Sequence, residues 1–518
     1  MKKRAIVYAA TIIAFFGVTA SAQENLIYTN LPVGKYAVGF KIFTLTDESR
    51  VDKPEYNYLG EKNEGDRRKK ITIHLWYPAK TNTGQRTISY GDYCYNSLLT
   101  NTSDVIDKNQ QEAGINSKRR SVENWFGKTT DEAWNKLIQT SMLAKIDAEP
   151  LQEKFPLLVG TLRDLSTSVT NEMLTSNGYV VAMIKDNNFT TGFAESALQE
   201  IPDMQFSIMK LEEKGNIDAD KIGTFGFSGS GFSQVLFSMY DYRIKAVADI
   251  ESGIYMDQLY QNFSASNYYQ PNKLRVPFLH IFSRDLSKQE KFIDDFENKT
   301  KFATRYRLIL NQPALHHWDF AAEGFTASIF LNNRGEQSDN IRQSFEIASI
   351  YLLNFFNAVL KDDMQAKTFL TSKPTLSNTQ SSLWDITTYA ASKPAPAKDD
   401  FDYIVKTKGF DEAISMVKST IKNDTLTDLY IPFVFNRVGY NFLNEKKYAE
   451  AISIFKLNTE LHPNDPNLFD SLAEAYELSG DKENMKKTSL VQMEILNKKD
   501  SLSDFEKGLK ANAEKRLN

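Results

Sequence analysis

The sequence predicts a doubly wound α/β domain with a mostly parallel sheet, followed by a C-terminal all-α domain of helical repeats. Two observations support this fold class. From about residue 34 to 385, short apolar runs alternate with stretches whose apolar residues recur at helical spacing. After a linker rich in Pro, Ala and Lys, the pattern stays helical to the end of the chain and repeats itself. A length of 518 residues suits two or three domains.

Seven short apolar runs are the predicted strands of the α/β domain. Several are apolar without interruption, which is typical of parallel strands buried on both faces of a sheet. Helices are predicted between them, because apolar residues recur there every three or four positions. The predicted strands are 71–77, 155–160, 179–184, 221–227, 245–250, 276–282 and 305–310, and the clearest helices are 201–211, 231–239 and 340–361.

Residues 81–154 do not follow this alternation. They are polar at first and then weakly helical over DEAWNKLIQTSMLAKI, residues 131–146. We interpret the stretch as an insertion between two strands, which either forms part of a lid or covers an edge of the sheet.

The C-terminal repeats resemble tetratricopeptide repeats. Residues 409–424 match residues 447–465, with Ala413 aligned to Ala451, and a weaker copy follows at 468–487. The residues near the places of that motif are Gly439, Tyr440, Tyr448, Ala451, Phe455 and Pro463. About three repeats are needed for independent stability. We therefore expect the array to pack partly on the α/β domain or on another chain, and the resemblance implies a surface for a protein partner.

The start of the chain is typical of a secretion signal. Residues 2–4 are basic, residues 5–18 are almost wholly apolar, and Ala20-Ser21-Ala22 fits a small-x-small cleavage site. The apolar core is short for a membrane span, so we expect cleavage, a mature chain that is not an integral membrane protein, and export to the periplasm or outside. The predicted organisation is a signal peptide (1–22), an α/β domain (23–388), a linker (389–400) and helical repeats (401–518).

Composition and charge exclude several classes of function. The net charge of −4 gives no electrostatic basis for binding nucleic acid. Cys94 is the only cysteine, so the chain has no internal disulfide. The 5 histidines form no HExxH motif and no spaced Cys/His set, so we expect neither a metal site nor a cofactor.

Ser228 is the predicted nucleophile. It lies in KIGTFGFSGSGFSQVLF, residues 221–237, where an apolar run changes to a helical pattern, as a nucleophile elbow requires. Gly226 supplies one of the small neighbours that a strained turn needs. The stretch departs from the G-x-S-x-G pattern, because Ser230 holds the last position and Gly231 follows it. The last glycine normally lets helix and strand pack closely, so a glycine-rich structural loop is the alternative interpretation.

Two adjacent histidines, His316 and His317, follow the predicted strand 305–310 and are candidates for the catalytic base. In this type of site the histidine comes after the nucleophile and the acid along the chain. We favour His317, because an H-x-D-F pattern often follows such a loop, and His316 is the alternative. His74 and His280 lie inside predicted strands and are interpreted as packed residues.

Two carboxylates are candidates for the third member of a triad. Glu251 follows the predicted strand 245–250, and Asp285 follows the predicted strand 276–282. The acid holds the imidazole in one tautomer and stabilises its charged form, so a glutamate serves as well as an aspartate. Asp249 shares a strand face with Glu251 but lies further inside the strand.

Much of residues 30–362 resembles the platelet-activating factor acetylhydrolase branch of the α/β-hydrolases. The resemblance implies a nucleophile at Ser228, a histidine in the pair 316–317, and an acid at Glu251, where the branch normally has aspartate. It tips the choice of acid from Asp285 to Glu251. The blocks that carry it are LPVGKYAVGFKIFTLTDESR, KITIHLWYPA, FPLLVG, SNGYVVAMI, GFSGSG, RIKAVADIESG, LHHWDF and YLLNFFNAVLKDD, in this order along the chain.

The expected oxyanion hole departs from the pattern of that family. After FPLLV the family usually carries a His-Gly pair, where this chain has Leu162 and Arg163. One expected donor is the N–H of Gly229, and the other would come from Asp164 or a neighbour. A carboxylate would repel a developing oxyanion unless it were turned away, and loss of one donor typically costs about 10²–10³ in rate. The sequence is thus compatible with a slow or repurposed hydrolase.

The leading hypothesis is an exported serine hydrolase that cleaves carboxyl esters through an acyl-enzyme. Ser228 attacks, His317 transfers the proton and Glu251 orients the histidine. The expected substrate is a small-molecule or lipid ester, and short acyl groups are implied by the resemblance alone. Two alternatives stay open: a serine peptidase or amidase with the same triad, and a catalytically weak hydrolase fold that serves as a repeat-bearing scaffold for protein binding.

Overall fold

The structure is a computed structural model. The predicted signal peptide, 1–22, lies outside the described residues, as do Asp164 and residues 392–400 of the predicted linker. Across the part of the chain that is described, no helix is both long enough and apolar enough to span a bilayer. The described residues are 25–81, 84–162, 166–185, 193–254, 256–266, 269–285, 290–300, 303–313, 315–331, 334–376, 379–391, 405, 409–423 and 432–518.

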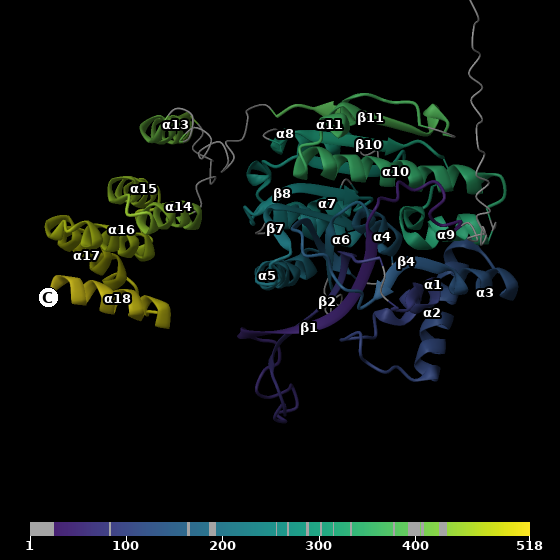
Figure 1. The fold of residues 1–518 in the computed structure, drawn as a ribbon, viewed down its shortest axis with the longest axis horizontal. Helices are drawn as coiled ribbons and strands as arrows, with labels where there is room; N and C mark the ends of the chain where they lie inside the picture. The colour runs from purple at the N-terminus through teal and green to yellow at the C-terminus, as the bar shows by residue number, and fades with distance from the viewer. Residues whose placement is uncertain are drawn as a thin grey trace, which may run out of the picture.

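The first domain is built on an 11-stranded sheet in the order β11-β10-β9-β8-β7-β5-β6-β2-β1-β4-β3 (Figure 1). The central strands β5 to β10 pair in parallel, whereas β2 runs antiparallel between β1 and β6, and β11 runs antiparallel to β10. The strands are β1 (Ala37–Val51), β2 (Arg68–Ala79), β3 (Thr87–Ser89), β4 (Ser141–Ile146), β5 (Phe155–Leu162), β6 (Val180–Lys185), β7 (Ile217–Phe227), β8 (Ile244–Ile250), β9 (Phe278–Ser283), β10 (Arg305–Leu310) and β11 (Trp384–Tyr389).

This sheet, mostly parallel with helices on both faces, confirms the predicted doubly wound α/β class. Each of the seven predicted strands coincides with a strand of the parallel core or with β2. Four strands, β1, β3, β4 and β11, had not been predicted. They lie towards the two edges of the sheet, where a strand has fewer buried neighbours and its apolar run is less continuous.

Helices cover both faces of the sheet. The clearest predicted helices correspond to α5, α6 and α10. The helices of this domain are α1 (Tyr90–Asn96), α2 (Lys108–Phe126), α3 (Asp131–Gln139), α4 (Ser168–Ser176), α5 (Phe193–Glu212), α6 (Gly229–Ser238), α7 (Asp257–Ser264), α8 (Glu290–Lys299), α9 (Ala322–Phe330), α10 (Gln337–Leu360) and α11 (Met364–Thr371), with short 3₁₀ turns η1 (Pro271–Lys273), η3 (His317–Phe320) and η4 (Ser381–Leu383).

Two apolar cores lie on opposite faces of the sheet. Successive residues of a strand point to opposite faces. In β5, Leu157 and Val159 join one core, together with residues of α5, α6 and α8, while Leu158 joins the other core with residues of α4, α9 and α10. Because both faces are covered, all eight residues of β5 are buried, which explains the uninterrupted apolar run in its sequence.

The insertion 81–154 adds two strands and three helices at one edge of the sheet. Residues 131–146 were expected to be weakly helical, but only α3 is helical, and SMLAKI forms strand β4. The physical reason is pairing: β4 runs parallel to β1, with Val38 opposite Ala144, and β3 pairs with β4. Met142 and Ala144 are buried with the period of two that a half-buried strand shows.

A buried carboxylate ties the insertion to the sheet domain. Glu172 of α4 is fully buried and accepts hydrogen bonds from the hydroxyl of Tyr93 in α1 (2.6 Å), from the hydroxyl of Tyr28, and from the N–H of Leu143 in β4 (2.7 Å). Burial raises the pKa of Glu172, although these donors oppose the shift. A fully hydrogen-bonded buried group fixes the elements around it, so α1, α4 and β4 form one packed unit.

The C-terminal domain is all-α, as predicted. Its repeats are closely packed: an added Cβ at Gly439 would lie 2.4 Å from the ring of Phe455, so only glycine lets α14 approach α15. Asp470 of α16 pairs with Arg516 of α18 at 2.7 Å. The resemblance to tetratricopeptide repeats stays a prediction. The helices are α13 (Phe410–Asn423), α14 (Pro432–Asn444), α15 (Tyr448–Leu461), α16 (Pro466–Ser479), α17 (Lys482–Asn497) and α18 (Asp504–Leu517).

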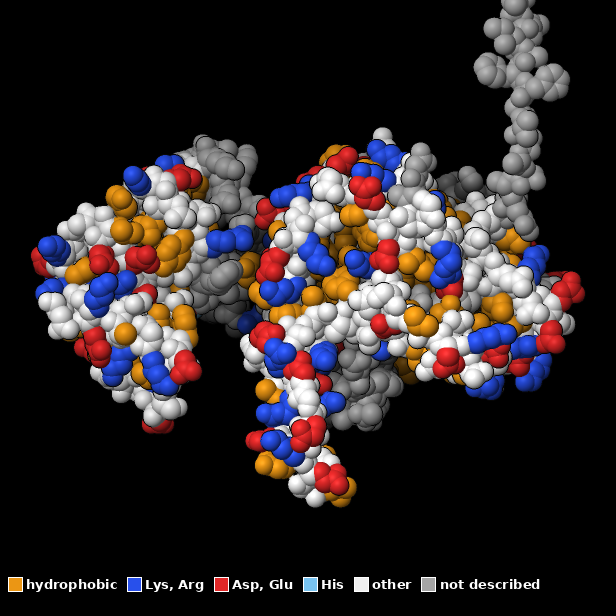
Figure 2. Space-filling view, turned by 60° about the horizontal axis from the view of Figure 1, so that its bottom comes forward, with side chains coloured by type: hydrophobic (Ala, Val, Ile, Leu, Met, Phe, Trp, Pro, Cys, Tyr) orange, Lys and Arg blue, Asp and Glu red, His pale blue; other side chains and the backbone are white. Residues whose placement is uncertain are grey.

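Charged side chains of both signs are interspersed over the face of the molecule shown in Figure 2. This distribution agrees with a nearly balanced composition of 62 basic and 66 acidic residues. Mixed surface charge of this kind does not create the single-sign field that steers a highly charged ligand.

Candidate active site

Ser228 lies on a sharp turn between β7 and α6. Its backbone has φ 57° and ψ −136°, a conformation that non-glycine residues rarely adopt. The turn is held by hydrogen bonds from the Ser228 N–H to the carbonyl of Ile250 (2.9 Å) and from the Gly231 N–H to the carbonyl of Ser228 (2.8 Å). Strained backbone of this type is retained where surrounding structure enforces it, and it clusters at functional sites.

The small residues around Ser228 are required by close backbone contacts. An added Cβ at Gly226 would lie 2.6 Å from the backbone carbon of Ser230. An added Cβ at Gly231 would lie 2.2 Å from a carboxylate oxygen of Asp249 on β8. Gly231 therefore allows the helix to pack on the neighbouring strand, which is the role that the last glycine of G-x-S-x-G normally has.

Ser230, which departs from the expected pattern, has a defined partner. Its Oγ lies 2.6 Å from the Oγ1 of Thr161, near the end of β5. The Ser230 hydroxyl also lies 3.2 Å from the carbonyl oxygen of Thr161. The serine thus ties the start of α6 to the strand that leads into residues 163–165, where Asp164 was expected to contribute to the oxyanion hole.

His317 is the predicted histidine that the structure brings to the serine. Its Nε2 lies 2.7 Å from the Oγ of Ser228. The ring stacks on Phe227, with ring centroids 4.8 Å apart and an interplanar angle of 24°. Burial lowers the pKa of His317 to about 4, because a buried imidazole loses the hydration of its charged form. The imidazole is therefore neutral near pH 7, as a general base must be.

The loop that carries His317 is fixed by Asp319. His316 is exposed, and its backbone N–H donates to the buried carboxylate of Asp319 at 2.7 Å. Arg334 contacts the same carboxylate at 3.3 Å. These contacts hold the 3₁₀ turn η3 and orient the two histidines differently, so only His317 meets Ser228. The sequence favoured His317 on its H-x-D-F pattern but kept His316 as an alternative, because adjacent residues share the same neighbours along the chain.

Glu251, the favoured acid, follows β8 in a strained and buried position. Its φ is 48°, and 4% of its surface is exposed. The carboxylate accepts hydrogen bonds from the N–H of Ser283 (2.7 Å) and from the hydroxyl of Ser283 (2.8 Å), at the end of β9. The pKa of Glu251 is raised to about 8: burial raises it most, the two Ser283 bonds oppose the shift, and the charges of Asp249 and Asp285 add to it.

The acid and the histidine are not joined in this structure. Among the described residues, no carboxylate forms a hydrogen bond or an ion pair with His317. Asp285, the alternative acid, is exposed in the turn after β9. Asp249 is fully buried and lies 2.9 Å from the Nδ1 of His280, and it also accepts from the hydroxyl of Ser252 at 2.7 Å. Asp249 is therefore engaged elsewhere, and His280 is packed inside β9 as expected.

Gly229, one of the two expected oxyanion donors, lies directly after Ser228 at the start of a helix. Gly229 is the first residue of α6, and the N–H groups of a first helical turn have no acceptor within their helix. They point towards the region in front of the helix, where partial positive charge favours an anion. The second expected donor, Asp164, belongs to residues 163–165, outside the described chain.

Two tryptophans that the sequence analysis did not single out lie beside the histidine. Trp318 follows His317 directly, and the two ring centroids are 5.7 Å apart. Trp125, near the end of α2 in the insertion, lies 5.9 Å from Trp318 between ring centroids. No signal in the local sequence indicates this contact, because it joins residues far apart in the chain.

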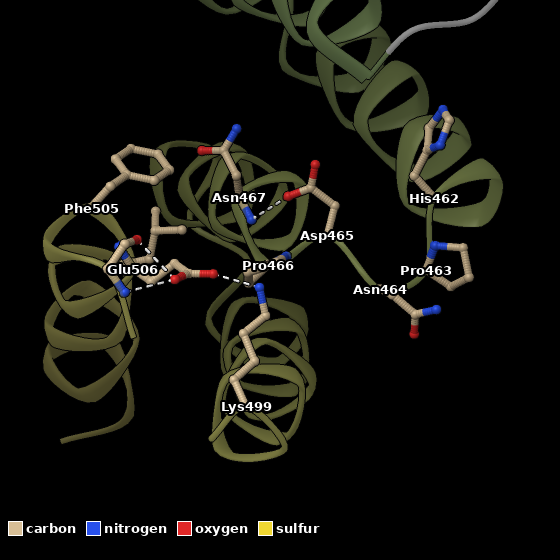
Figure 3. Close-up of a pocket in the computed structure, with 11 residues that line it drawn as sticks. His462, Pro463, Asn464, Asp465, Pro466, Asn467, Lys499, Phe505 and Glu506 are labelled. Carbon is tan, nitrogen blue, oxygen red and sulfur yellow. Dashed lines mark hydrogen bonds and ion pairs between the residues drawn. The ribbon is translucent and has the colours of Figure 1, made fainter. Parts of the chain in front are cut away.

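A hollow lies in the repeats. It has a volume of about 640 Å³ and is formed by the α15–α16 connection, the start of α16, the α17–α18 connection and α18 (Figure 3). Its polar side chains are mostly paired: Glu506 contacts Lys499 and accepts from Ser503 at 2.8 Å. It is lined by His462, Pro463, Asn464, Asp465, Pro466, Asn467, Lys499, Ser503, Phe505, Glu506 and Leu509. Across the described chain, no group of three or more His, Cys, Asp or Glu residues is arranged to hold a metal ion.

The chain is similar in structure to a number of solved proteins. No family model matches the chain, and no curated protein matches it. A ferulic acid esterase from Streptomyces cinnamoneus is similar in structure, with a TM-score of 0.45 and 18% sequence identity, over 69% of this chain and 98% of that chain. At this level of similarity, the chemistry of the site is inferred from its own geometry, and the fold is described as a mostly parallel α/β sheet domain followed by an all-α C-terminal region.

Proposed function

We propose that the protein is a serine hydrolase that cleaves carboxyl esters. The observation that carries this proposal is the 2.7 Å contact between His317 Nε2 and Ser228 Oγ on a strained strand-to-helix turn. A nucleophile and a base within hydrogen-bond distance are the minimum for covalent acyl transfer. The low pKa of His317, a result of burial, keeps the imidazole free to accept the serine proton.

The reaction proceeds in two halves. Ser228 Oγ attacks the acyl carbonyl while His317 Nε2 takes its proton, and the tetrahedral oxyanion accepts the Gly229 N–H. His317 then protonates the leaving alcohol, and the C–O bond breaks to leave an acyl-Ser228 ester. Water enters, His317 takes its proton, and collapse of the second tetrahedral intermediate releases the acid and restores the serine. A second oxyanion donor is assigned to the stretch 162–165, with Asp164 as the candidate.

Glu251 is the proposed acid, with Asp285 as the alternative. Glu251 lies at the carboxyl end of the strand that neighbours the nucleophile strand, which is the edge where such folds place their functional groups. Burial raises the pKa of Glu251 to about 8. A positively charged imidazolium nearby favours the ionised carboxylate, so the acid and base would couple as the reaction charges His317.

Several finer features belong to the proposal. Short acyl groups and membership in the acetylhydrolase branch follow from the resemblance of the sequence blocks. Export to the periplasm or outside follows from the first 22 residues, and a protein partner for the repeats follows from their resemblance to tetratricopeptide repeats. A small-molecule or lipid ester is the proposed substrate.

The test uses the full mature chain and two measurements. Ser228→Ala is expected to abolish hydrolysis of p-nitrophenyl acetate and to abolish labelling by a fluorophosphonate probe, which forms a P–O bond to an activated serine with loss of fluoride. Ser238→Ala, on the same helix but remote from the turn, is the matched control and should retain both. Equal turnover and labelling in the Ser228 variant and the parent would reject the assignment.

A further inference from the structure

We infer that the aromatic surface formed by Trp125 and Trp318, which the buried ring of Phe227 supports from behind, binds the alcohol part of the ester, and that this part carries an aromatic ring. The inference rests on the proposed function for the claim that the bound group is part of an ester. The position of the binding surface is inferred from the geometry and exposure of the aromatic rings. It assigns a substrate-binding role to the insertion 81–154.

The three rings are continuous with the base. Trp318 meets the ring of His317 at 5.7 Å and 75°, and it meets the ring of Phe227 at 5.7 Å and 60°. Trp125 extends this surface by one further ring, 5.9 Å from Trp318 with an interplanar angle of 45°. These separations lie within the 4.5–7 Å range in which aromatic rings attract one another. The surface therefore begins at the catalytic imidazole and leads away from it.

Trp125 is unusually exposed for a tryptophan. It is 51% exposed, although its neighbour Phe126 and nearby Val122 are buried with 5% and 2% exposure. Singly exposed apolar side chains are common, but Trp125 adjoins Trp318 beside the candidate base, and contiguous apolar surface of this kind marks binding sites. A tryptophan ring also binds flat ligands at a low cost in conformational entropy, since only two side-chain torsions are involved.

The helix that carries Trp125 is anchored against the site. Lys118 of α2 forms an ion pair with Glu323 of α9 at 2.8 Å, and both side chains are largely buried. Ser166, just after the residues of the expected oxyanion loop, lies 3.5 Å from the same carboxylate oxygen, and its carbonyl accepts from the N–H of Ala322 at 2.8 Å. Trp125 is therefore held in position before any substrate binds, as a preorganised binding surface requires.

The mechanism decides which part of the ester lies on these rings. His317 must reach the oxygen of the leaving alcohol to protonate it. That oxygen, and the group attached to it, therefore lies on the imidazole side of Ser228, and the rings adjoin this imidazole. Indole rings carry no net charge, and stacked or edge-to-face aryl contacts add to simple burial of apolar area. An aryl group on the alcohol fits this surface better than a charged or a saturated group.

The test compares acetate esters that differ in the alcohol alone: 2-phenylethyl, 2-cyclohexylethyl and ethyl acetate. The parent is expected to prefer 2-phenylethyl acetate. Trp125→Ala should lower the ratio of kcat/KM for the phenylethyl ester to that for the cyclohexylethyl ester by about 3- to 10-fold, the range that an aromatic pair contributes. Trp125→Phe should restore much of the ratio. The matched control is Tyr58→Ala, since Tyr58 is a fully exposed aromatic residue outside the site.

Three results would overturn the inference. The first is an unchanged phenyl-to-cyclohexyl ratio in Trp125→Ala. The second is an equal loss in the Tyr58 control. The third is a fall in kcat/KM of Trp125→Ala for ethyl 3-phenylpropanoate in place of a fall for 2-phenylethyl acetate. This result would place the aryl group on the acyl side of the ester.

Binding of the product alcohol separates this inference from the proposed function. If the parent hydrolyses none of the esters, the proposed ester hydrolysis is rejected. Saturation-transfer NMR with 2-phenylethanol still measures binding to the aromatic surface in that case. The Ser228→Ala protein should bind this alcohol, and adding Trp125→Ala should weaken binding by about 3- to 10-fold. Equal binding by the two proteins would reject the aromatic surface, whatever the enzyme assays show.

Discussion

The Oγ of Ser230 lies 2.6 Å from the Oγ1 of Thr161, and both side chains are buried. This contact accounts for a serine where the elbow pattern normally has glycine. The close packing that glycine allows is supplied one position later, by Gly231 against Asp249. Ser230 is then free to bond to the strand on the other side of the nucleophile. The departure from G-x-S-x-G at Ser230 therefore keeps the close packing of the turn and adds a contact with Thr161.

Ser230→Ala is expected to lower the free energy of unfolding by about 1–2 kcal/mol, because the buried hydroxyl of Thr161 loses its partner. Urea denaturation followed by circular dichroism measures the change. Ser233→Ala is the matched control on the same helix: its buried hydroxyl has no hydrogen-bond partner within the described chain, so the change should be neutral or slightly stabilising. An equal loss in the two variants would attribute the effect to volume and not to the hydrogen bond.

Gly226→Ala should disable the elbow. The added methyl group would lie 2.6 Å from backbone carbon of Ser230, and backbone atoms of a packed turn cannot move aside as a flexible side chain can. A shift of about 1 Å at the nucleophile costs about 10²-fold in rate, so kcat/KM for p-nitrophenyl acetate is expected to fall by at least that factor. Gly84→Ala is the control, since nothing lies within 4 Å of its added Cβ. Normal activity in the Gly226 variant would show that the turn tolerates a side chain there.

Glu251→Gln distinguishes the two candidate acids. The amide keeps the shape of the side chain but cannot stabilise an imidazolium, and a comparable change in a serine protease triad lowers kcat about 10⁴-fold. We expect a loss approaching this size with p-nitrophenyl acetate. Asp285→Asn, at an exposed position, should change kcat by less than about twofold. The reverse pattern would assign the acid to Asp285 and leave Glu251 as a structural residue held by Ser283.

The pH dependence of kcat/KM should reflect the buried imidazole. The pKa of His317 is lowered to about 4 by burial, whereas an ordinary histidine titrates near 6.5. The base itself is therefore expected to stay active to well below pH 6.5. Glu251→Gln removes the carboxyl group of raised pKa, so the acid limb of kcat/KM for a neutral ester in this variant should lie nearer pH 4–5. An acid limb at pH 6.5–7 would contradict this, and would indicate that a carboxylate pairs with His317 in the working enzyme.

Stability should fall with rising pH because of Glu251. In the folded protein its pKa is raised to about 8, against an ordinary value of 4.5. Between these two values the unfolded chain releases the proton and the folded chain keeps it, so the stabilising contribution is present below pH 4.5 and is lost as pH rises to 8. Thermal unfolding of Glu251→Gln should show a flatter dependence than the parent over this interval. Parallel curves for the two proteins would show that Glu251 is ionised in the folded state.

The sequence predicted the parallel core well and the sheet edges poorly. The strands of the core are buried on both faces, so their residues are apolar whatever lies next to them, and local composition reveals them. Strand β4 is different. SMLAKI alternates between buried and exposed positions and continues from a helix, so it became a strand through pairing with β1, a partner about 100 residues earlier in the chain. Such pairing leaves little trace in a short window of sequence.

What the sequence by itself determined was the set of candidate reactive groups: a serine between small residues at a strand-to-helix junction, two histidines after a later strand, and two acids at strand ends. These depend on local backbone requirements, which short motifs record. Only the tertiary structure decided which histidine meets Ser228, where the carboxylate of Glu251 points, and that Trp125 of the insertion reaches the histidine loop. Those outcomes depend on how the packed helices and strands direct their side chains. Contacts between distant segments have no fixed spacing in the chain, so the sequence alone does not reveal them.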